Sequence, residues 1–493
     1  MNNTVSRRSF LGDMTLTSAS ALWLPRFGLA AAERKSMPNV LLITADDMGF
    51  STVGVTGHKA LNVTPNIDKL ASQGIRFEHA HVTAAVCQPC RQTLMTGRYP
   101  HRTGSLGFEP ITKDVPTLQE SLRAAGYMNG IMAKEEHLAP IEKFCWDMVV
   151  SAKDLGLGRD PRLYFEHARE FFESAKSSGK PFYLMANSYD PHRPFSGSRQ
   201  EQEVIKAQRI TMPVPEASRR YTPEEVQLPP FLPDLPAVRK ELAEYYTSSR
   251  RCDDTVGAVL RALDESGLAG NTLVMFLSDH GMPFPSAKAH CYPQSTRTPW
   301  IVRWPGNIQP SMVDTKHFVA GIDYMPSILD ALELPSVEGM DGHSFLPVLF
   351  GKEQSGRDKV FTHFNKVRAG TFYPTRCVQD KRFCYIFNAW SDGKLENRSD
   401  AHSGLTFRAM IDAAKTDEDM AKRVEFLRYR IPEEYYDLRT DPYALDNLIN
   451  DKEYQEEIHA ARKFLREHME STGDLVLELF DKHLAAAASP SED

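Results

Sequence analysis

Residues 39–47, Asn-Val-Leu-Leu-Ile-Thr-Ala-Asp-Asp (NVLLITADD), combine an unbroken apolar run with two adjacent acids. The run 40–44 has the length and the apolar character of a strand that is buried on both faces of a sheet. Open sheets of parallel strands bind ligands at the carboxyl ends of their strands. The stretch therefore predicts an α/β fold with Asp46 and Asp47 at the ligand-binding edge of its sheet.

Short apolar runs continue to alternate with helical patterns beyond this stretch, as far as about residue 350. Such alternation is typical of a mainly parallel sheet flanked by helices. A second strand end also carries polar ligand types, because Asp279 and His280 follow the run that ends at Leu277. We predict further strands at 130–133, 182–186, 272–277 and 300–303, and helices at 66–73, 117–125, 239–266 and 324–332.

The chain of 493 residues is longer than one hydrophobic core usually supports, so a second, smaller domain is expected. After about residue 350 the pattern changes to a hairpin at 377–387 and an amphipathic helix at 452–471. We predict a catalytic domain over 33–350 and a smaller α+β domain over 351–493.

Charge and cysteine content exclude several classes of protein. A net charge of −7 and a pI near 6.2 argue against a protein that holds a nucleic-acid backbone. Seven cysteines are too few for a disulfide scaffold. These values favour an ordinary globular protein whose anionic ligands, if any, meet a local cluster of cations.

The N-terminus has the pattern of a targeting segment. Arg7 and Arg8 precede a mildly apolar run, 13–32, that ends in three alanines. We interpret 1–32 as a twin-arginine signal peptide that is absent from the mature protein, which is then periplasmic or extracellular. No later stretch reaches the roughly 18 apolar residues that a membrane span needs, so no membrane span is expected.

The acids at the two strand ends suggest an oxygen-rich site for a divalent metal, because adjacent carboxylates repel each other without a cation. Taken alone, Asp46-Asp47 fits a helix cap equally well, and Asp279-His280-Gly281 fits a turn. A parallel sheet brings such strand ends side by side. The two motifs together therefore favour a metal site.

Residues 86–98, VCQPCRQTLMTGR, allow more than one chemistry. Cys87-Gln88-Pro89-Cys90 has the C-x-x-C form of thiol redox sites and metal knuckles. A redox site leaves Arg91 and the acids without a role. A structural zinc site needs a second pair of ligands that the sequence does not supply nearby.

The spacing Cys87-x-Pro89-x-Arg91-x-x-Leu94-x-Thr96-Gly97-Arg98 resembles the formylglycine motif of the type I sulfatases, in the alkaline phosphatase superfamily. Motifs in the same order extend the resemblance over nearly the whole mature chain. The stretch 283–285, Pro-Phe-Pro, is most similar to the sulfamidase branch, the N-sulfoglucosamine sulfohydrolases. The matching motifs include Pro38-Asn39-Val40, Asp190-Pro191-His192-Arg193, Ser278-Asp279-His280-Gly281 and Tyr436-Asp437-Leu438.

The resemblance implies an alkaline-phosphatase-like fold and a role for each motif residue. Cys87 would be oxidised to formylglycine by a formylglycine-generating enzyme, and the hydrated aldehyde would attack sulfur. Asp46, Asp47, Asp279, His280 and residue 87 would hold Ca²⁺. Arg91 would hold the diol, and Lys134 and Lys288 would neutralise the transferred group. His192 would protonate the leaving group, and His137 would act on the diol side.

Three features depart from the family pattern. Cys90 stands where relatives commonly have a small residue, so Cys87 is expected to be converted before export to an oxidising compartment. His280 stands where many relatives have asparagine, and its imidazole is a softer metal ligand than an amide oxygen. Two residues separate Lys134 from His137 where many relatives have one.

We therefore expect a sulfohydrolase that removes sulfate from a sulfated saccharide, N-sulfated glucosamine of heparin or heparan sulfate being favoured. Two alternatives keep the fold: an O-sulfatase on another glycan, or a phosphoester hydrolase with unmodified Cys87. A third is a thiol redox or metal-binding protein that uses Cys87 and Cys90. The sequence carries no signal of the oligomeric state.

Overall fold

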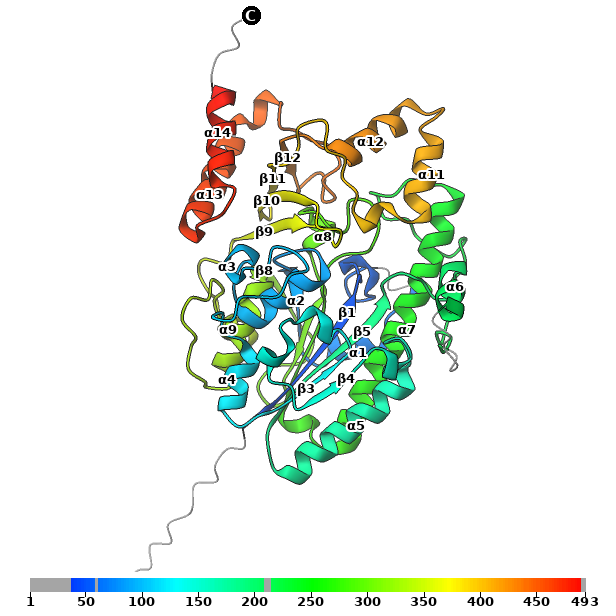
Figure 1. Cartoon of the computed structure of the whole chain (residues 1–493), viewed down its shortest axis with the longest axis vertical. Coiled ribbons are helices and arrows are strands. Elements are labelled where there is room, and N and C mark those ends of the chain that lie inside the picture. The colour runs from blue at the N-terminus through cyan, green and yellow to red at the C-terminus, as the bar shows by residue number, and fades with distance from the viewer. Residues whose placement is uncertain (1–36, 58–60, 208–213, 489–493) are drawn as a thin grey trace, which may run out of the picture. The chain divides into compact units, whose positions relative to one another are not determined.

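Strand β1 (Asn39–Asp46) lies near the middle of an eight-stranded sheet in the computed structural model, which describes residues 37–57, 61–207 and 214–488 (Figure 1). The strand order is β4-β3-β5-β1-β6-β7-β2-β8. All neighbouring pairs are parallel except the two that β7 makes. The predicted mainly parallel sheet is confirmed.

The other strands of this sheet are β2 (Ile75–His81), β3 (Met128–Met132), β4 (Met148–Val150), β5 (Phe182–Pro191), β6 (Thr272–Ser278), β7 (Trp300–Arg303) and β8 (Met312–Ala320). The helices of the same region are α1 (Pro65–Ser72), α2 (Cys87–Thr96), α3 (Pro100–Thr103), α4 (Leu118–Ala124), α5 (Pro161–Ser178), α6 (Arg199–Ala207), α7 (Pro236–Ser266), α8 (Pro293–Thr296), α9 (Tyr324–Ala331) and α10 (Leu346–Leu349).

Side-chain alternation along β1 builds two cores, one on each face of the sheet. Val40 and Leu42 pack with residues of α2, α4 and α9. Leu41 and Ile43 pack with residues of α1, α5 and α7 on the opposite face. Figure 1 shows α2, α4 and α9 on one side of the strands and α5 and α7 on the other. The continuous apolar run of β1 is therefore explained by a strand that has no solvent face.

The sequence predictions of individual elements agree with the structure for all five strands and all four helices. Three strands of this sheet were not predicted: β2, β4 and β8. Their sequences carry polar residues between the apolar ones, because they lie at or near the two edges of the sheet and are partly exposed. An edge strand lacks the continuous apolar run by which the central strands were recognised.

A second sheet, antiparallel and of four strands, follows in the order β12-β11-β10-β9. It confirms the predicted hairpin and α+β character of the C-terminal region, and the helix predicted at 452–471 is α13. The domain boundary at 350/351 stays a prediction. The elements are β9 (Lys359–Lys366), β10 (Phe372–Asp380), β11 (Phe383–Asn388), β12 (Glu433–Asp437), α11 (Leu405–Ala413), α12 (Glu418–Tyr429), α13 (Gln455–Thr472) and α14 (Leu477–Ala488).

The two sheets are joined next to the start of α2. His363 of β9 donates its backbone N–H to the carbonyl of Thr83 at 2.8 Å, and the segment 83–86 leads directly into Cys87. The C-terminal sheet thus supports the loop that carries the predicted nucleophile.

Of the two predictions about targeting, the structure describes the residues of only one. The proposed signal peptide, 1–32, lies outside the described residues. Within the part of the chain that the structure describes, no helix combines the length and the apolar character needed to cross a bilayer.

Candidate active site

The ends of three central strands lie level with one another at the carboxyl edge of the large sheet. Asp46 of β1 is in register with Pro191 of β5, and Ala45 with Ser278 of β6. Asp47 has a φ of 74°, a left-handed conformation that aspartate tolerates better than most residues. This turn breaks the strand alternation, so both aspartates contribute to one buried site.

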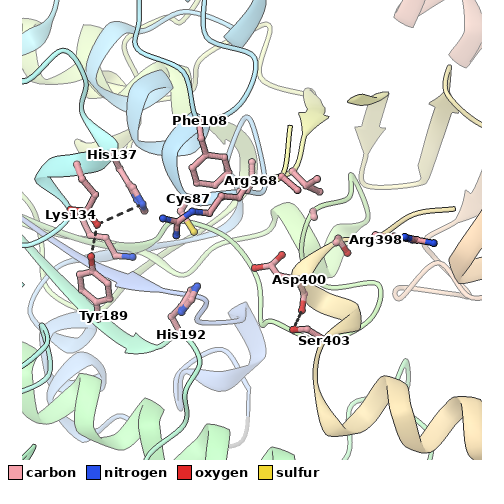
Figure 2. Close-up of a pocket in the computed structure, with 16 residues that line it drawn as sticks. Cys87, Phe108, Lys134, His137, Tyr189, His192, Arg368, Arg398, Asp400 and Ser403 are labelled. Atoms are coloured by element: carbon pink, nitrogen blue, oxygen red, sulfur yellow. Dashed lines mark hydrogen bonds and ion pairs between the residues drawn. The ribbon is translucent and has the colours of Figure 1, made fainter. Parts of the chain in front are cut away.

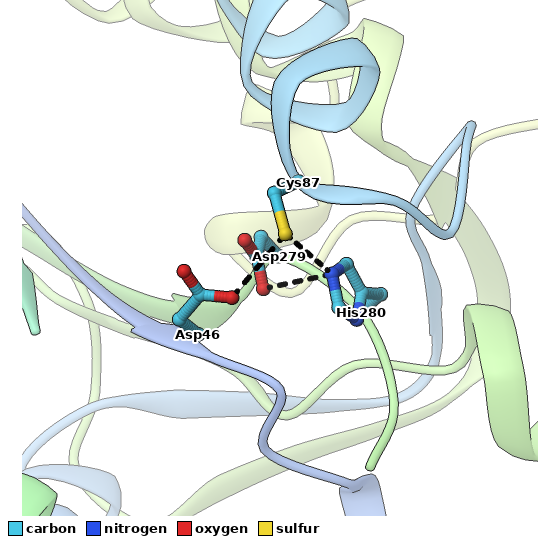
Figure 3. A group of neighbouring side chains, drawn as sticks. All are labelled: Asp46, Cys87, Asp279 and His280. Atoms are coloured by element: carbon cyan, nitrogen blue, oxygen red, sulfur yellow. Dashed lines mark hydrogen bonds and ion pairs between the residues drawn. The ribbon is translucent and has the colours of Figure 1, made fainter. Parts of the chain in front are cut away.

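Cys87 is the first residue of α2 and its side chain reaches the same place (Figure 3). The Sγ atom lies 3.4 Å from Oδ1 of Asp46 and 3.3 Å from Nε2 of His280. One ligand atom from each of Asp46, Cys87, Asp279 and His280 lies within 4.8 Å of the others. The structure therefore brings together four of the five residues predicted to hold the metal.

Arg91 lies one turn after Cys87 on α2 and is fully buried. Its guanidinium donates to Oδ2 of Asp279 at 2.8 Å and to Oδ1 of Asn187 at 2.7 Å. It also donates to Thr44 of β1 at 2.9 Å. Arg91 thus ties α2 to the ends of β1, β5 and β6, and its predicted contact with a diol stays a prediction.

Two lysines balance the charge of the aspartates. The Lys134 ammonium forms an ion pair with Asp46 and lies 3.7 Å from the ring centre of Tyr189. The Lys288 ammonium lies 2.8 Å from Oδ1 of Asp47 and 2.7 Å from Oδ2 of Asp400. Lys288 is buried behind the aspartates, so its predicted contact with the transferred group stays a prediction.

These cations set the ionisation of the site. Burial alone would raise the pKa of Asp46, but the Lys134 ammonium and the other nearby cations outweigh burial and hold this pKa well below its ordinary value. In the same way, Lys288 outweighs burial and lowers the pKa of Asp400 to about 2. Both carboxylates are therefore anionic at neutral pH.

The donor set fits a hard divalent cation. Oδ2 of Asp46 and both side-chain oxygens of Asp47 accept no hydrogen bond of regular geometry from the described residues, although all three are buried. His280 Nδ1 lies 3.1 Å from the carbonyl oxygen of Gly281, a contact that leaves Nε2 facing the carboxylates. These carboxylate oxygens, two of which face the ammonium groups of Lys134 and Lys288, are suitable ligands for a metal together with one imidazole nitrogen.

Two other groups of possible ligands lie in the described chain. Asp46 and Asp47 form an overlapping group with His192, which was not predicted as a ligand. His101, His363 and Asp474 form a separate group. In that group Asp474 already pairs with the Arg376 guanidinium, at 2.5 Å and 2.9 Å, so its charge is neutralised. The site at the strand ends is therefore the better candidate for a cation.

A cavity of about 460 Å³ opens above Cys87 (Figure 2). Its wall on the side of the large sheet carries the predicted residues Cys87, Lys134, His137 and His192. The opposite wall comes from the C-terminal region. The residues that contribute to that wall are Val367, Arg368, Ala369, Arg398, Ser399, Asp400 and Ser403.

The two predicted proton carriers line this cavity. His137 reaches it because residues 135–137 form a single 3₁₀ turn after Lys134, whose carbonyl accepts the His137 N–H at 3.0 Å. This turn accommodates the extra residue between Lys134 and His137. Burial, with Lys134, lowers the pKa of His137 well below its ordinary value.

His192 follows the end of β5 and is held by its backbone. The Arg159 guanidinium donates to the His192 carbonyl at 2.9 Å and pairs with the neighbouring Asp190. The His192 Nδ1 lies 2.6 Å from the carbonyl of Arg193, so Nε2 remains available to the cavity. Nε2 lies 4.0 Å from Asp47, and the side chain is 32% exposed. Burial lowers the pKa of His192.

Several residues of the site were missed by the sequence analysis. Asn187 and Tyr189 lie on β5 just before the Asp-Pro-His-Arg motif, so the strand end itself could have signalled them. Asp400 and Arg368 lie far along the chain in no recognised motif. Only the packing of the C-terminal region against the large sheet reveals them.

The thiols do not support a redox pair. Burial, together with Asp46, raises the pKa of the Cys87 thiol well above its ordinary value, whereas reactive thiols have lowered pKa values. Cys90 is fully buried in the apolar core that α2 shares with β1. The cavity is lined by Cys87 and not by Cys90, so no dithiol faces a substrate.

Comparison with known proteins decides the family. The sequence model of the sulfatase family matches residues 38–334, more than half of the chain. The chain belongs to the sulfatase family. A second model, of the C-terminal region of N-sulphoglucosamine sulphohydrolase, matches residues 284–395. The protein is accordingly a hydrolase of sulfate esters or sulfamates, and the thiol redox alternative loses its support.

The names of two relatives of this sulfatase state the saccharide on which each of them acts. Human N-sulphoglucosamine sulphohydrolase is 29% identical over 467 residues, covering 88% of this chain and 90% of that protein. An ulvan-active sulfatase of Formosa agariphila is 27% identical over 480 residues, covering 89% and 75%. A sulfatase active on sulfated sugars is therefore supported.

Solved structures share the fold of this sulfatase. One, of a protein in complex with its substrate D-glucosamine-2-N,6-O-disulfate, has a TM-score of 0.64 at 16% identity and covers 89% of this chain and 99% of that chain. The phosphonate monoester hydrolase of Agrobacterium radiobacter has a TM-score of 0.65 at 18% identity, covering 88% and 96%. These likenesses confirm the alkaline-phosphatase-like fold.

Proposed function

We propose that this sulfatase removes the N-sulfate of a glucosamine saccharide of the heparin or heparan sulfate type, with formylglycine at position 87 as nucleophile. The observation that carries the proposal is the position of the residue 87 side chain, next to Asp46 and His280 and at the floor of a cavity that His192 also lines. The similarity to N-sulphoglucosamine sulphohydrolase along almost the whole chain supports the substrate class.

The reaction would proceed in three steps: transfer of the sulfuryl group to residue 87, elimination of sulfate, and addition of water to the aldehyde, which restores the diol. In the first step one hydroxyl of the hydrated formylglycine passes its proton to Asp46, whose Oδ1 lies 3.4 Å from Sγ of Cys87, and attacks sulfur. The S–N bond breaks while His192 gives its proton to the departing amine nitrogen. The second hydroxyl then loses its proton, its oxygen forms the aldehyde C=O bond, and the C–O bond to sulfate breaks. His137 lies on the side of residue 87 and would accept that proton. The sulfate ester of a serine has no second hydroxyl and could not expel sulfate in this way.

The metal of this site is proposed to be Ca²⁺, held by Asp46, Asp47, Asp279, His280 and residue 87. When bound, it would polarise a sulfate oxygen. Three carboxylates supply most of the oxygen ligands that Ca²⁺ prefers. Lys134 keeps Asp46 ionised, and Arg91 positions Asp279 through a hydrogen bond.

Sulfate release from a panel of N-sulfated and O-sulfated glucosamine saccharides tests the substrate. The proposal expects release from the N-sulfated members, with a free amine as the second product. Release from O-sulfated members alone would replace it by an O-sulfatase on the same fold. Release of phosphate from phosphoesters by a protein with unmodified Cys87 would favour the phosphoester alternative.

Replacing His192 by glutamine should lower the rate of sulfate release far more when the leaving group is an amine than when it is a phenol. Loss of a general acid typically costs about 10²–10⁴-fold, so we expect a loss of this size with glucosamine N-sulfate. Nitrophenyl sulfate, whose leaving group departs without a proton, should lose much less. Initial rates on the two substrates measure the difference.

The matched variant is His137→Gln, which changes the second histidine of the same cavity. Because His137 acts after the leaving group has departed, its loss should lower the rates on both substrates together. Equal losses with both substrates in the His192 variant would argue against the assigned role of His192.

Mass spectrometry of the tryptic peptide 77–91 tests the modification. This peptide contains both Cys87 and Cys90. We expect a mass lower than that of the unmodified peptide and alkylation of one thiol, not two. Two alkylated thiols in an active preparation would contradict a formylglycine nucleophile.

The same preparation tests the proposed export. We propose that the mature enzyme is periplasmic or extracellular, reached through a twin-arginine signal after a formylglycine-generating enzyme has converted Cys87. Protein isolated from the periplasmic fraction should then lack residues 1–32 and already carry the modified peptide. A full-length N-terminus in that fraction would contradict the signal.

A further inference from the structure

The C-terminal wall of the catalytic cavity carries an arginine that the described residues leave unpaired. Arg368 lies in the turn between β9 and β10, and its side chain is exposed. Figure 2 shows it among the residues drawn around Cys87. With the described residues it makes no hydrogen bond, ion pair or cation–π contact.

The other fully charged side chains of the cavity already have partners. Lys134 pairs with Asp46, and Glu136 accepts a hydrogen bond from the Tyr189 hydroxyl. On the opposite wall, Asp400 pairs with Lys288 at 2.7 Å. Arg398 pairs with Glu396 at 3.0 Å. Arg368 is thus the charge in this cavity that remains free to meet a ligand, as far as the described residues show.

The backbone that leads into Arg368 is fixed by the two residues before it. Val367 is 7% exposed and packs in an apolar cluster with Val86 and Ala289, which also line the cavity. Lys366 forms an ion pair with Glu109 at 2.6 Å. Because Val86 directly precedes Cys87, this packing ties the base of the Arg368 side chain to the nucleophile.

We infer that Arg368 binds a second anionic group of the substrate, separate from the sulfate that is removed. The inference rests on the proposed function and makes it more specific. A guanidinium presents a planar pair of donors that matches the two oxygens of a sulfate or a carboxylate. The group is an O-sulfate of the same glucosamine or the carboxylate of an adjacent uronic acid.

The charge of the cavity is the reason why we expect a single arginine to have a large effect on the binding of a second anion. The half-exposed carboxylate of Asp400 lies on the same wall and repels a second anion. The guanidinium of Arg368 offsets this repulsion, since Lys288 contacts Asp400 from the buried side. A substrate that carries only the scissile sulfate gains little from Arg368.

Three substrates and three variants test the inference. The substrates are glucosamine N-sulfate, a glucosamine with both N-sulfate and O-sulfate, and a disaccharide of a uronic acid and glucosamine N-sulfate. The variants are Arg368→Ala, Arg368→Lys and, as matched control, Arg382→Ala. Arg382 is exposed beyond the other end of β10 and does not line the cavity.

Arg368→Ala is expected to lower kcat/KM by about 10- to 100-fold, mainly through KM, on the substrate that carries the recognised second anion. On glucosamine N-sulfate the change should stay within about 3-fold. Arg368→Lys should recover part of the loss, and Arg382→Ala should match the wild type. The substrate affected identifies the second anion as O-sulfate or carboxylate.

Equal losses on all three substrates would overturn the inference, because Arg368 would then act on the scissile sulfate itself. No loss on any substrate would overturn it as well.

A binding measurement separates this inference from the proposed function. Calorimetric titration of the Cys87→Ala protein with glucosamine O-sulfate and with the free uronosyl-glucosamine should show binding of one of them that Arg368→Ala weakens by a similar factor. If the wild type releases no N-sulfate at all, the proposed function fails, and this titration still decides the role of Arg368. Binding that is unchanged by Arg368→Ala would contradict the inference.

Discussion

Replacing Cys87 by alanine is expected to lower kcat/KM for sulfate release by at least about 10⁴-fold, the loss typical of removing a covalent nucleophile. The side chain is 5% exposed, and alanine is a good helix former at the first position of α2, so the fold should persist. Steady-state sulfate release and circular dichroism of the same preparation measure both properties.

Cys90→Ala is the matched control, three residues away on the same helix. Cys90 belongs to the apolar core, so its truncation should reduce thermal stability modestly and leave activity within a few-fold of wild type. Comparable loss of activity in both variants would favour a function that needs the pair of thiols. A Cys87→Ala protein that retains most of its activity would remove residue 87 from the chemistry.

Replacing Asp46 by asparagine is expected to lower sulfate release by at least about 10³-fold, since the loss of Lewis-acid stabilisation is worth several kcal/mol. Asparagine keeps the shape but removes the charge that pairs with Lys134 and faces Sγ of Cys87 at 3.4 Å. The variant should also lose bound metal, which elemental analysis measures. Added Ca²⁺ should raise the melting temperature of wild type and not of the variant.

His101→Gln provides the control for the metal measurement. It alters the separate group of His101, His363 and Asp474, where Arg376 already neutralises the carboxylate. Metal content and sulfate release should therefore stay close to wild type. Loss of metal in the His101 variant, with full metal in the Asp46 variant, would show that the cation binds to the group of His101, His363 and Asp474. The proposed metal site at Asp46 would then be wrong.

The central strands and the motif residues could be predicted because local sequence encodes them. A strand buried on both faces needs a continuous apolar run, as in β1, β5 and β6, and the acids that follow such runs lie at one edge of a parallel sheet. The edge strands β4 and β8, and β2 next to one edge, were missed because their exposed positions break that run.

The contacts among the motif residues could not be predicted in the same way. The ion pair of Lys288 with Asp400 joins residues more than a hundred positions apart, and the 3₁₀ turn after Lys134 decides that His137 faces the cavity. The contact of Lys288 with Asp400 depends on how the C-terminal region docks on the large sheet, where His363 bonds to Thr83, and no local pattern records this docking.

By itself the sequence determined the α/β class, the order of the sulfatase motifs and the place of Cys87 in them, because periodicity and spacing are properties of neighbouring residues. Only the tertiary structure decided which charges are paired. It pairs Asp400 with a buried lysine and leaves Arg368 open to the cavity, since pairing depends on distances between segments that the chain brings together only when it folds.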